Sequence, residues 1–71
     1  MAKLKTRICE LRKEFNIKQD ELAKLVGVRR ETIGHLENGR YNPSLKLSID
    51  IAKIFGKSVE EVFEFIEEED E

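Results

Sequence analysis

Apolar residues recur at three- and four-residue steps along most of the chain, and this spacing predicts amphipathic helices. The first apolar stripe consists of Leu4, Ile8, Leu11 and Phe15. The pattern predicts helices over about residues 5–15, 19–26, 30–38 and 44–55. Asn16, Gly27, Gly39 and Gly56 follow these four segments, and such residues tolerate the left-handed backbone that ends a helix. The pattern alone therefore predicts a mostly helical chain.

The segment from Leu45 to Ile51 is also compatible with a strand, because apolar and polar residues alternate along it. The alternation stops at Ala52, whereas Leu45, Ile49, Ala52 and Phe55 form a helical stripe. We therefore favour a helix here, with Ser44 as its N-cap.

A capping box marks the start of a last helix, because Ser58 is followed three residues later by Glu61. Apolar residues at helical spacing come next, namely Val59, Val62, Phe63 and Ile66. We expect an acidic C-terminal helix and tail over residues 58–71.

Residues 19–38 fit a helix-turn-helix unit, in which two short helices flank a turn that contains glycine. The turn covers Val26-Gly27-Val28-Arg29. Such a turn sets the second helix at a steep angle, so that its first residues can protrude into the major groove of DNA.

Composition narrows the class of protein. The chain has 71 residues, of which 39% are hydrophobic, and this is enough for one small domain over residues 1–71. Cys9 is the only cysteine, which excludes an internal disulfide, and Cys9 and His35 are too few to hold a metal. The sequence has neither a membrane-spanning apolar run nor a signal peptide, so we expect a cytoplasmic protein with no membrane partner.

The net charge of −2 argues against a nucleic-acid ligand, but the charge is unevenly distributed. Residues 1–46 hold 11 basic and 6 acidic residues, whereas residues 47–71 hold 2 basic and 9 acidic residues. A basic first part and an acidic end are compatible with DNA binding by the first part.

Residues 18–63 read KQDELAKLVGVRRETIGHLENGRYNPSLKLSIDIAKIFGKSVEEVF. This string resembles the lambda-repressor-like (Cro/Xre-type) helix-turn-helix family, and the resemblance extends over about residues 5–65. It implies an all-α, five-helix fold and a prokaryotic, archaeal or phage transcription regulator that binds operators as a homodimer.

The resemblance also implies which residues contact double-stranded DNA. Those expected to read base edges are Arg30, Glu31 and His35. Those expected to contact phosphates are Gln19, Arg29, Thr32, Asn38, Arg40 and Tyr41. Each assignment has a plainer alternative: Arg30 and His35 are ordinary surface residues, and Glu31 only complements the helix dipole.

Two positions depart from what a helix of this kind usually carries. Arg29 replaces the Ser or Thr cap that the family usually has, so it either adds a phosphate contact or is a tolerated substitution. Gly34 lies inside a helix, where it either permits close approach to DNA or has no role. The resemblance further implies a structural ion pair between Arg12 and Glu37.

The acidic end has either a purely structural role or a role in dimerisation. In the second interpretation, the residues at the dimer interface are Val62, Phe65 and Ile66. We expect no catalytic residues, because no acid–base pair, phosphate-binding glycine loop or metal-ligand set is present, and we expect no cofactor or small-molecule ligand. The alternative function is an antitoxin-like regulator or a protein-interaction module whose main partner is another protein.

Overall fold

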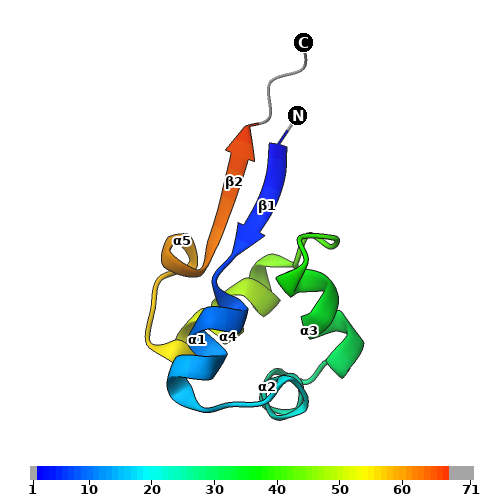
Figure 1. Ribbon diagram of the computed structural model, residues 1–71, viewed down its shortest axis with the longest axis vertical. Helices are drawn as coiled ribbons and strands as arrows, with labels where there is room; N and C mark the ends of the chain where they lie inside the picture. The colour runs from blue at the N-terminus through cyan, green and yellow to red at the C-terminus, as the bar shows by residue number, and fades with distance from the viewer. Residues whose placement is uncertain (1, 68–71) are drawn as a thin grey trace.

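The computed structural model describes residues 2–67, and within them five short helices form the body of the molecule (Figure 1). The helices are α1 (Ile8–Phe15), α2 (Gln19–Val26), α3 (Arg30–Glu37), α4 (Leu45–Phe55) and α5 (Val59–Val62). The five-helix fold is thus confirmed, and α4 is a helix rather than a strand. Two strands accompany the helices, β1 (Ala2–Thr6) and β2 (Phe63–Glu67).

The helix ends follow the signals in the sequence. Asn16 ends α1 in the left-handed conformation, with φ of 59°. Ser44 Oγ accepts a hydrogen bond from the Leu47 N–H at 3.1 Å and so caps α4. The capping box of α5 is present in both directions, because Ser58 and Glu61 each accept from the other's backbone N–H. The bond from the Ser58 N–H to the Glu61 carboxylate is the largest cause that holds the pKa of Glu61 below its ordinary value, and the Ser58 hydroxyl adds to it.

The strands correct two predictions. The first helix begins at Ile8 instead of about residue 5, and the closing helix ends at Val62 because residues 63–67 form β2. The two strands pair antiparallel, from Ala2 opposite Glu67 to Thr6 opposite Phe63. Pairing satisfies the backbone groups that the two segments turn toward each other, and a helix at either end would leave the other segment without this partner. The predicted tail at 68–71 lies outside the described residues.

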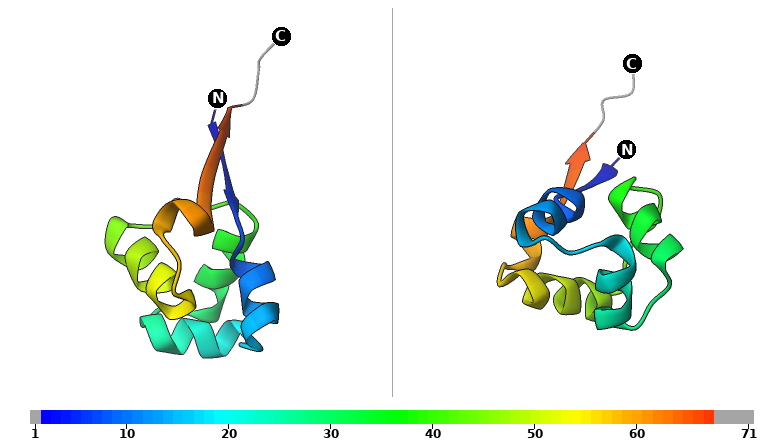
Figure 2. Two further views of the ribbon diagram at one scale, coloured as in Figure 1. Left: turned by 90° about the vertical axis from the view of Figure 1, so that its left-hand side faces the viewer. Right: turned by 60° about the horizontal axis from the view of Figure 1, so that its bottom comes forward.

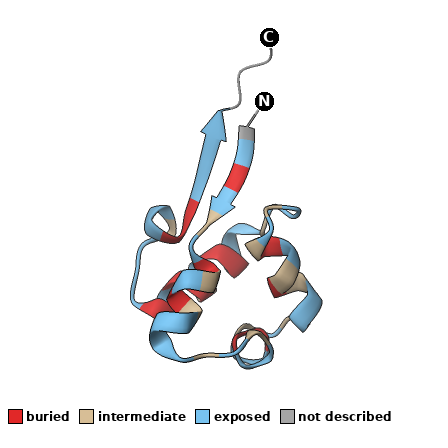
Figure 3. Ribbon diagram, in the orientation of Figure 1, coloured by how far each residue is buried: buried red, intermediate tan, exposed pale blue. Residues whose placement is uncertain are grey.

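The paired strands form a ribbon that projects beyond the helices, as the two views of Figure 2 show. The ribbon contributes two side chains to the core, Leu4 from the middle of β1 (5% exposed) and Phe63 from the start of β2 (9% exposed). The rest of the core lies between the helices, where the buried positions gather in Figure 3. Its fully buried large side chains are Ile8, Leu22, Ile33, Leu36, Ile51 and Val62.

The burial of Val62 corrects one predicted contact. The sequence places Val62 at a dimer interface, but its side chain is 1% exposed. The chain passes from α5 into β2 directly after Val62, and the Val62 side chain belongs to the core of the same chain. A partner therefore cannot contact Val62 without opening that core.

Candidate nucleic-acid interface

The helix-turn-helix unit consists of α2 and α3, which pack directly against each other. Ile33 and Leu36 point from α3 into the core and are fully buried. Because α3 has only eight residues, anchoring these two side chains leaves the opposite side of the helix to solvent. On that side Arg30, Glu31 and His35 are all exposed.

A shallow depression brings most of the predicted DNA-contacting residues together. It is lined by Gln19, Arg30, Glu31, Gly34, His35, Asn38 and Arg40. The set includes all three predicted base-reading residues and three of the six predicted phosphate-contacting ones. We call this surface the reading face. Arg29, Thr32 and Tyr41 are not among its lining residues, although Arg29 and Tyr41 are exposed.

An ion pair ties α1 to α3 beneath the reading face. Arg12 Nε donates to Glu37 Oε2 at 2.6 Å and Arg12 Nη2 donates to Glu37 Oε1 at 3.3 Å. Both side chains are largely shielded, with exposed fractions of 13% and 9%. The hydrogen bond to Glu37 raises the pKa of Arg12, and it outweighs the opposing effect of burial. The resemblance implied this pair, and the structure contains it.

The same carboxylate also holds a residue of the reading face. Gln19 Nε2 donates to Glu37 Oε1 at 2.7 Å. This bond orients the Gln19 amide at the N-terminus of α2, and it leaves the second N–H of the amide for another acceptor. The resemblance implies that Gln19 braces the second helix of the unit, but local spacing does not identify Glu37 as the acceptor, because the two residues are 18 positions apart.

The two unusual positions of the unit have clear local consequences. Arg29 is the N-cap residue of α3. Its side chain makes no capping hydrogen bond, because a guanidinium group has no acceptor atom. A Cβ at Gly34 would meet Gln19 Nε2 at 3.9 Å, an ordinary contact. The packing within the chain therefore does not require glycine at position 34.

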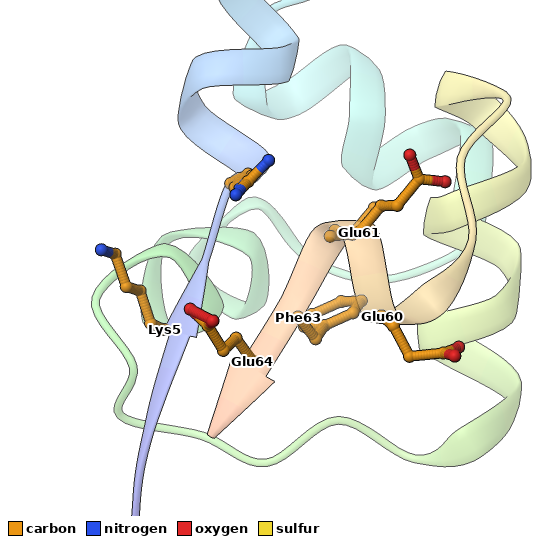
Figure 4. Close-up of a pocket in the computed structure, with 7 residues that line it drawn as sticks. Lys5, Glu60, Glu61, Phe63 and Glu64 are labelled. Carbon is orange, nitrogen blue, oxygen red and sulfur yellow. The ribbon is translucent and has the colours of Figure 1, made fainter. Parts of the chain in front are cut away.

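Residues 2–67 carry open depressions besides the reading face, among them one of about 410 Å³ between the ribbon and the end of α3 and one of about 380 Å³ between α1 and α2. No group of three metal-ligating side chains exists within residues 2–67. A small cavity of about 50 Å³ lies where the ribbon meets α5, and Figure 4 shows Lys5, Glu64 and Phe63 around it. That volume holds water rather than a substrate. None of the helices in the described part is long and apolar enough to cross a membrane.

Comparison with known proteins gives consistent matches. A model of the helix-turn-helix family matches residues 9–62. A helix-turn-helix-type transcriptional regulator of Archaeoglobus fulgidus is 59% identical over 66 residues, which is 93% of both chains. Another from Methanocaldococcus jannaschii is 46% identical over 68 residues, covering 96% of this chain and 100% of the relative.

Solved structures agree on the fold. The restriction-modification controller protein C.AhdI from Aeromonas hydrophila superposes with a TM-score of 0.70 and 33% identity, over 78% of this chain and 83% of its own. The transcriptional regulator VanUg superposes with a TM-score of 0.76 and 22% identity, over 94% and 89% of the two chains.

Proposed function

Because this chain belongs to the lambda-repressor-like (Cro/Xre-type) helix-turn-helix family of DNA-binding transcriptional regulators, we propose that it represses transcription by binding a pseudo-palindromic operator as a homodimer. Members of this family are regulators without enzymatic activity, and the chain is accordingly not an enzyme. We propose that it acts in the cytoplasm, where its DNA is found.

The observation that carries this proposal is the convergence of Arg30, Glu31 and His35 on one solvent-facing side of α3. The major groove is wide enough to admit a helix, so these side chains would reach base edges first. Arg30 presents two parallel N–H donors that match the O6 and N7 acceptors of guanine, and Glu31 matches the N4 donor of cytosine.

Residues around the reading face would hold the phosphates. Gln19, Asn38 and Arg40 also line the reading face, and we expect them to contact the phosphates beside the bases that α3 reads. Arg29, Thr32 and Tyr41 would extend these contacts beyond the depression. The bond from Gln19 to Glu37 supports this role, because it holds one phosphate donor in a defined position relative to α3.

The charge distribution also supports DNA binding through α3. Glu60, Glu61, Glu64 and Glu67 lie on α5 and β2, outside the reading face (Figure 1). Their charge would repel DNA from that end of the molecule and so confine binding to α3. Two protomers related by a two-fold axis would then place their α3 helices about 34 Å apart, in successive turns of the major groove.

The salt dependence of DNA binding tests this proposal. Phosphate contacts release counterions, so the affinity for duplex DNA should fall linearly on a plot of log K against log salt concentration. Arg40→Ala should weaken binding to all sequences alike and reduce the slope by about 1. The measurement is fluorescence anisotropy of a labelled duplex at a series of salt concentrations.

Lys57→Ala is the matched control, because it removes one exposed cation from the loop between α4 and α5, outside the reading face. It should leave the slope unchanged. Equal effects of the two variants would show that DNA is held by diffuse charge rather than by the reading face. An affinity for duplex DNA that does not change with salt would favour the alternative function, a module whose main partner is another protein.

A further inference from the structure

The ribbon has two outer edges, and its register shows which backbone groups point toward them. The Arg7 N–H donates to the Val62 carbonyl at 2.9 Å, which continues the ladder beyond Thr6 and Phe63. Hydrogen-bonded pairs alternate along an antiparallel ladder, so Lys5–Glu64 and Lys3–Ile66 are also such pairs. The backbone groups of Leu4 and Phe65 consequently point outward.

The two edges differ in what covers them. The edge of β1 lies against the turn after α3, because a Cβ built on Gly39 would come within 2.5 Å of the Leu4 carbonyl oxygen. The edge of β2 has α5 beside its base only, and its outer half projects past the described helices (Figures 1 and 2). An uncovered strand edge is a template for another strand.

Exposed apolar side chains mark this same half of β2. Phe65 is 61% exposed and Ile66 is 40% exposed. They are consecutive residues of a strand, so they lie on opposite faces of the ribbon. A partner docked on one face could cover only one of them, whereas a strand added to the edge covers both.

We propose that the edge of β2 pairs with the same edge of a second copy of this chain, so that two ribbons form one four-stranded antiparallel sheet. This inference rests on the homodimer of the proposed function and assigns its interface. The two-fold axis passes between Phe65 and the partner subunit's Phe65, whose outward N–H and carbonyl groups bond to each other.

The side chains of β2 favour this register, and they favour a second copy of the chain as the partner. With Phe65 at the axis, each Glu64 lies opposite the partner subunit's Ile66, and each Glu64 keeps Lys5 beside it on its own ribbon. Sliding the strands by two residues one way places Glu64 against the partner's Glu64, which is repulsive. Sliding them the other way pairs Ile66 with the partner subunit's Ile66 but sets each Phe65 ring opposite the partner subunit's Glu67. The register with Phe65 at the axis is thus the one that pairs the most exposed apolar side chain of the strand with its own copy and opposes no like charges.

Sedimentation equilibrium of the full chain tests the interface. The wild type should sediment at twice its monomer mass of 8.3 kDa, and Phe65→Lys should sediment as the monomer. Leu45→Lys is the matched control, because Leu45 is a large apolar residue, 74% exposed, on α4. It should leave the dimer intact, and circular dichroism should show the same helix content in all three proteins.

Cross-linking tests the register independently of how Phe65→Lys folds. Opposite Cα atoms in a hydrogen-bonded antiparallel pair are about 5.5 Å apart, within the reach of a disulfide. In a Cys9→Ser background, Phe65→Cys should form a covalent dimer under mild oxidation, and Leu45→Cys should form at least tenfold less.

Several results would overturn the interface. One is a wild-type chain that stays monomeric at hundreds of micromolar, with and without DNA. Another is a dimer that survives Phe65→Lys but not Leu45→Lys. A third is equal cross-linking of Phe65→Cys and Leu45→Cys. Binding to a duplex with one half-site separates this failure from that of the proposed function. A monomer that still binds a half-site contradicts only the interface, whereas a β2 dimer that binds no DNA contradicts only the function.

Discussion

Glu37→Ala is expected to lower the free energy of unfolding by about 3 kcal/mol, because it leaves the shielded guanidinium of Arg12 without its carboxylate. It also removes the acceptor of the Gln19 amide. Arg12 would keep only its longer bonds, to the Ile17 carbonyl at 3.2 Å and to Cys9 Sγ at 3.8 Å. The measurement is urea denaturation followed by circular dichroism.

Asp50→Ala provides the matched control, because Asp50 pairs with Lys46 at 2.7 Å on an exposed side of α4. An exposed pair four residues apart in a helix contributes only about 0.3–0.5 kcal/mol, so this variant should be nearly neutral.

The double variant Arg12→Met with Glu37→Leu should recover much of the lost stability, since an apolar pair replaces the buried charges. It should not recover DNA affinity, because Gln19 still lacks its partner. Similar losses for Glu37→Ala and Asp50→Ala would contradict a structural role for the pair beneath the reading face.

Gly39→Ala has the second large expected effect, a loss of about 3 kcal/mol or more in the free energy of unfolding. Gly39 has φ of +69°, a backbone conformation that costs an L-residue about 1 kcal/mol. Its new methyl group would also lie 2.5 Å from the Leu4 carbonyl oxygen, which belongs to backbone and cannot rotate away. The backbone of the turn or of β1 must therefore shift, which disturbs the packing of Leu4 in the core.

Gly27→Ala separates the cost of the positive φ from the cost of the contact with the Leu4 carbonyl oxygen. Gly27 has a similar φ of +74°, but a Cβ added there would meet no atom within 4 Å. This variant should lose only about 1 kcal/mol. Hydrogen exchange should show lower protection of β1 in Gly39→Ala and unchanged protection in Gly27→Ala. If the two variants unfold at the same urea concentration, the close approach of the turn to β1 is not a constraint on stability.

The helices could be predicted from the sequence because each combines a local stripe with a local end signal. Asn16, Ser44 and the pair Ser58 and Glu61 act within a few residues, and all four behave as their chemistry indicates. The ribbon could not be predicted in this way. Its strands come from opposite ends of the chain, and the spacing of Val59, Val62 and Ile66 fits a helix until β1 is available as a partner.

The reading face was partly predictable for the same reason. Arg30, Glu31 and His35 share one side of a short helix, so their common orientation follows from spacing. The contact between Gln19 and Glu37 depends on how α2 crosses α3, and no local pattern encodes it. The prediction for Val62 was wrong because its exposure depends on the turn from α5 into β2.

Selection of bound sequences from random duplex DNA tests the central claim most directly. The wild type should enrich a pseudo-palindromic site with two half-sites about one helical turn apart. Arg30→Ala should lose discrimination at one base position in each half-site and leave the remaining positions intact. If no half-site is enriched, or if Arg30→Ala selects the same sequences as the wild type, α3 does not read DNA through this face.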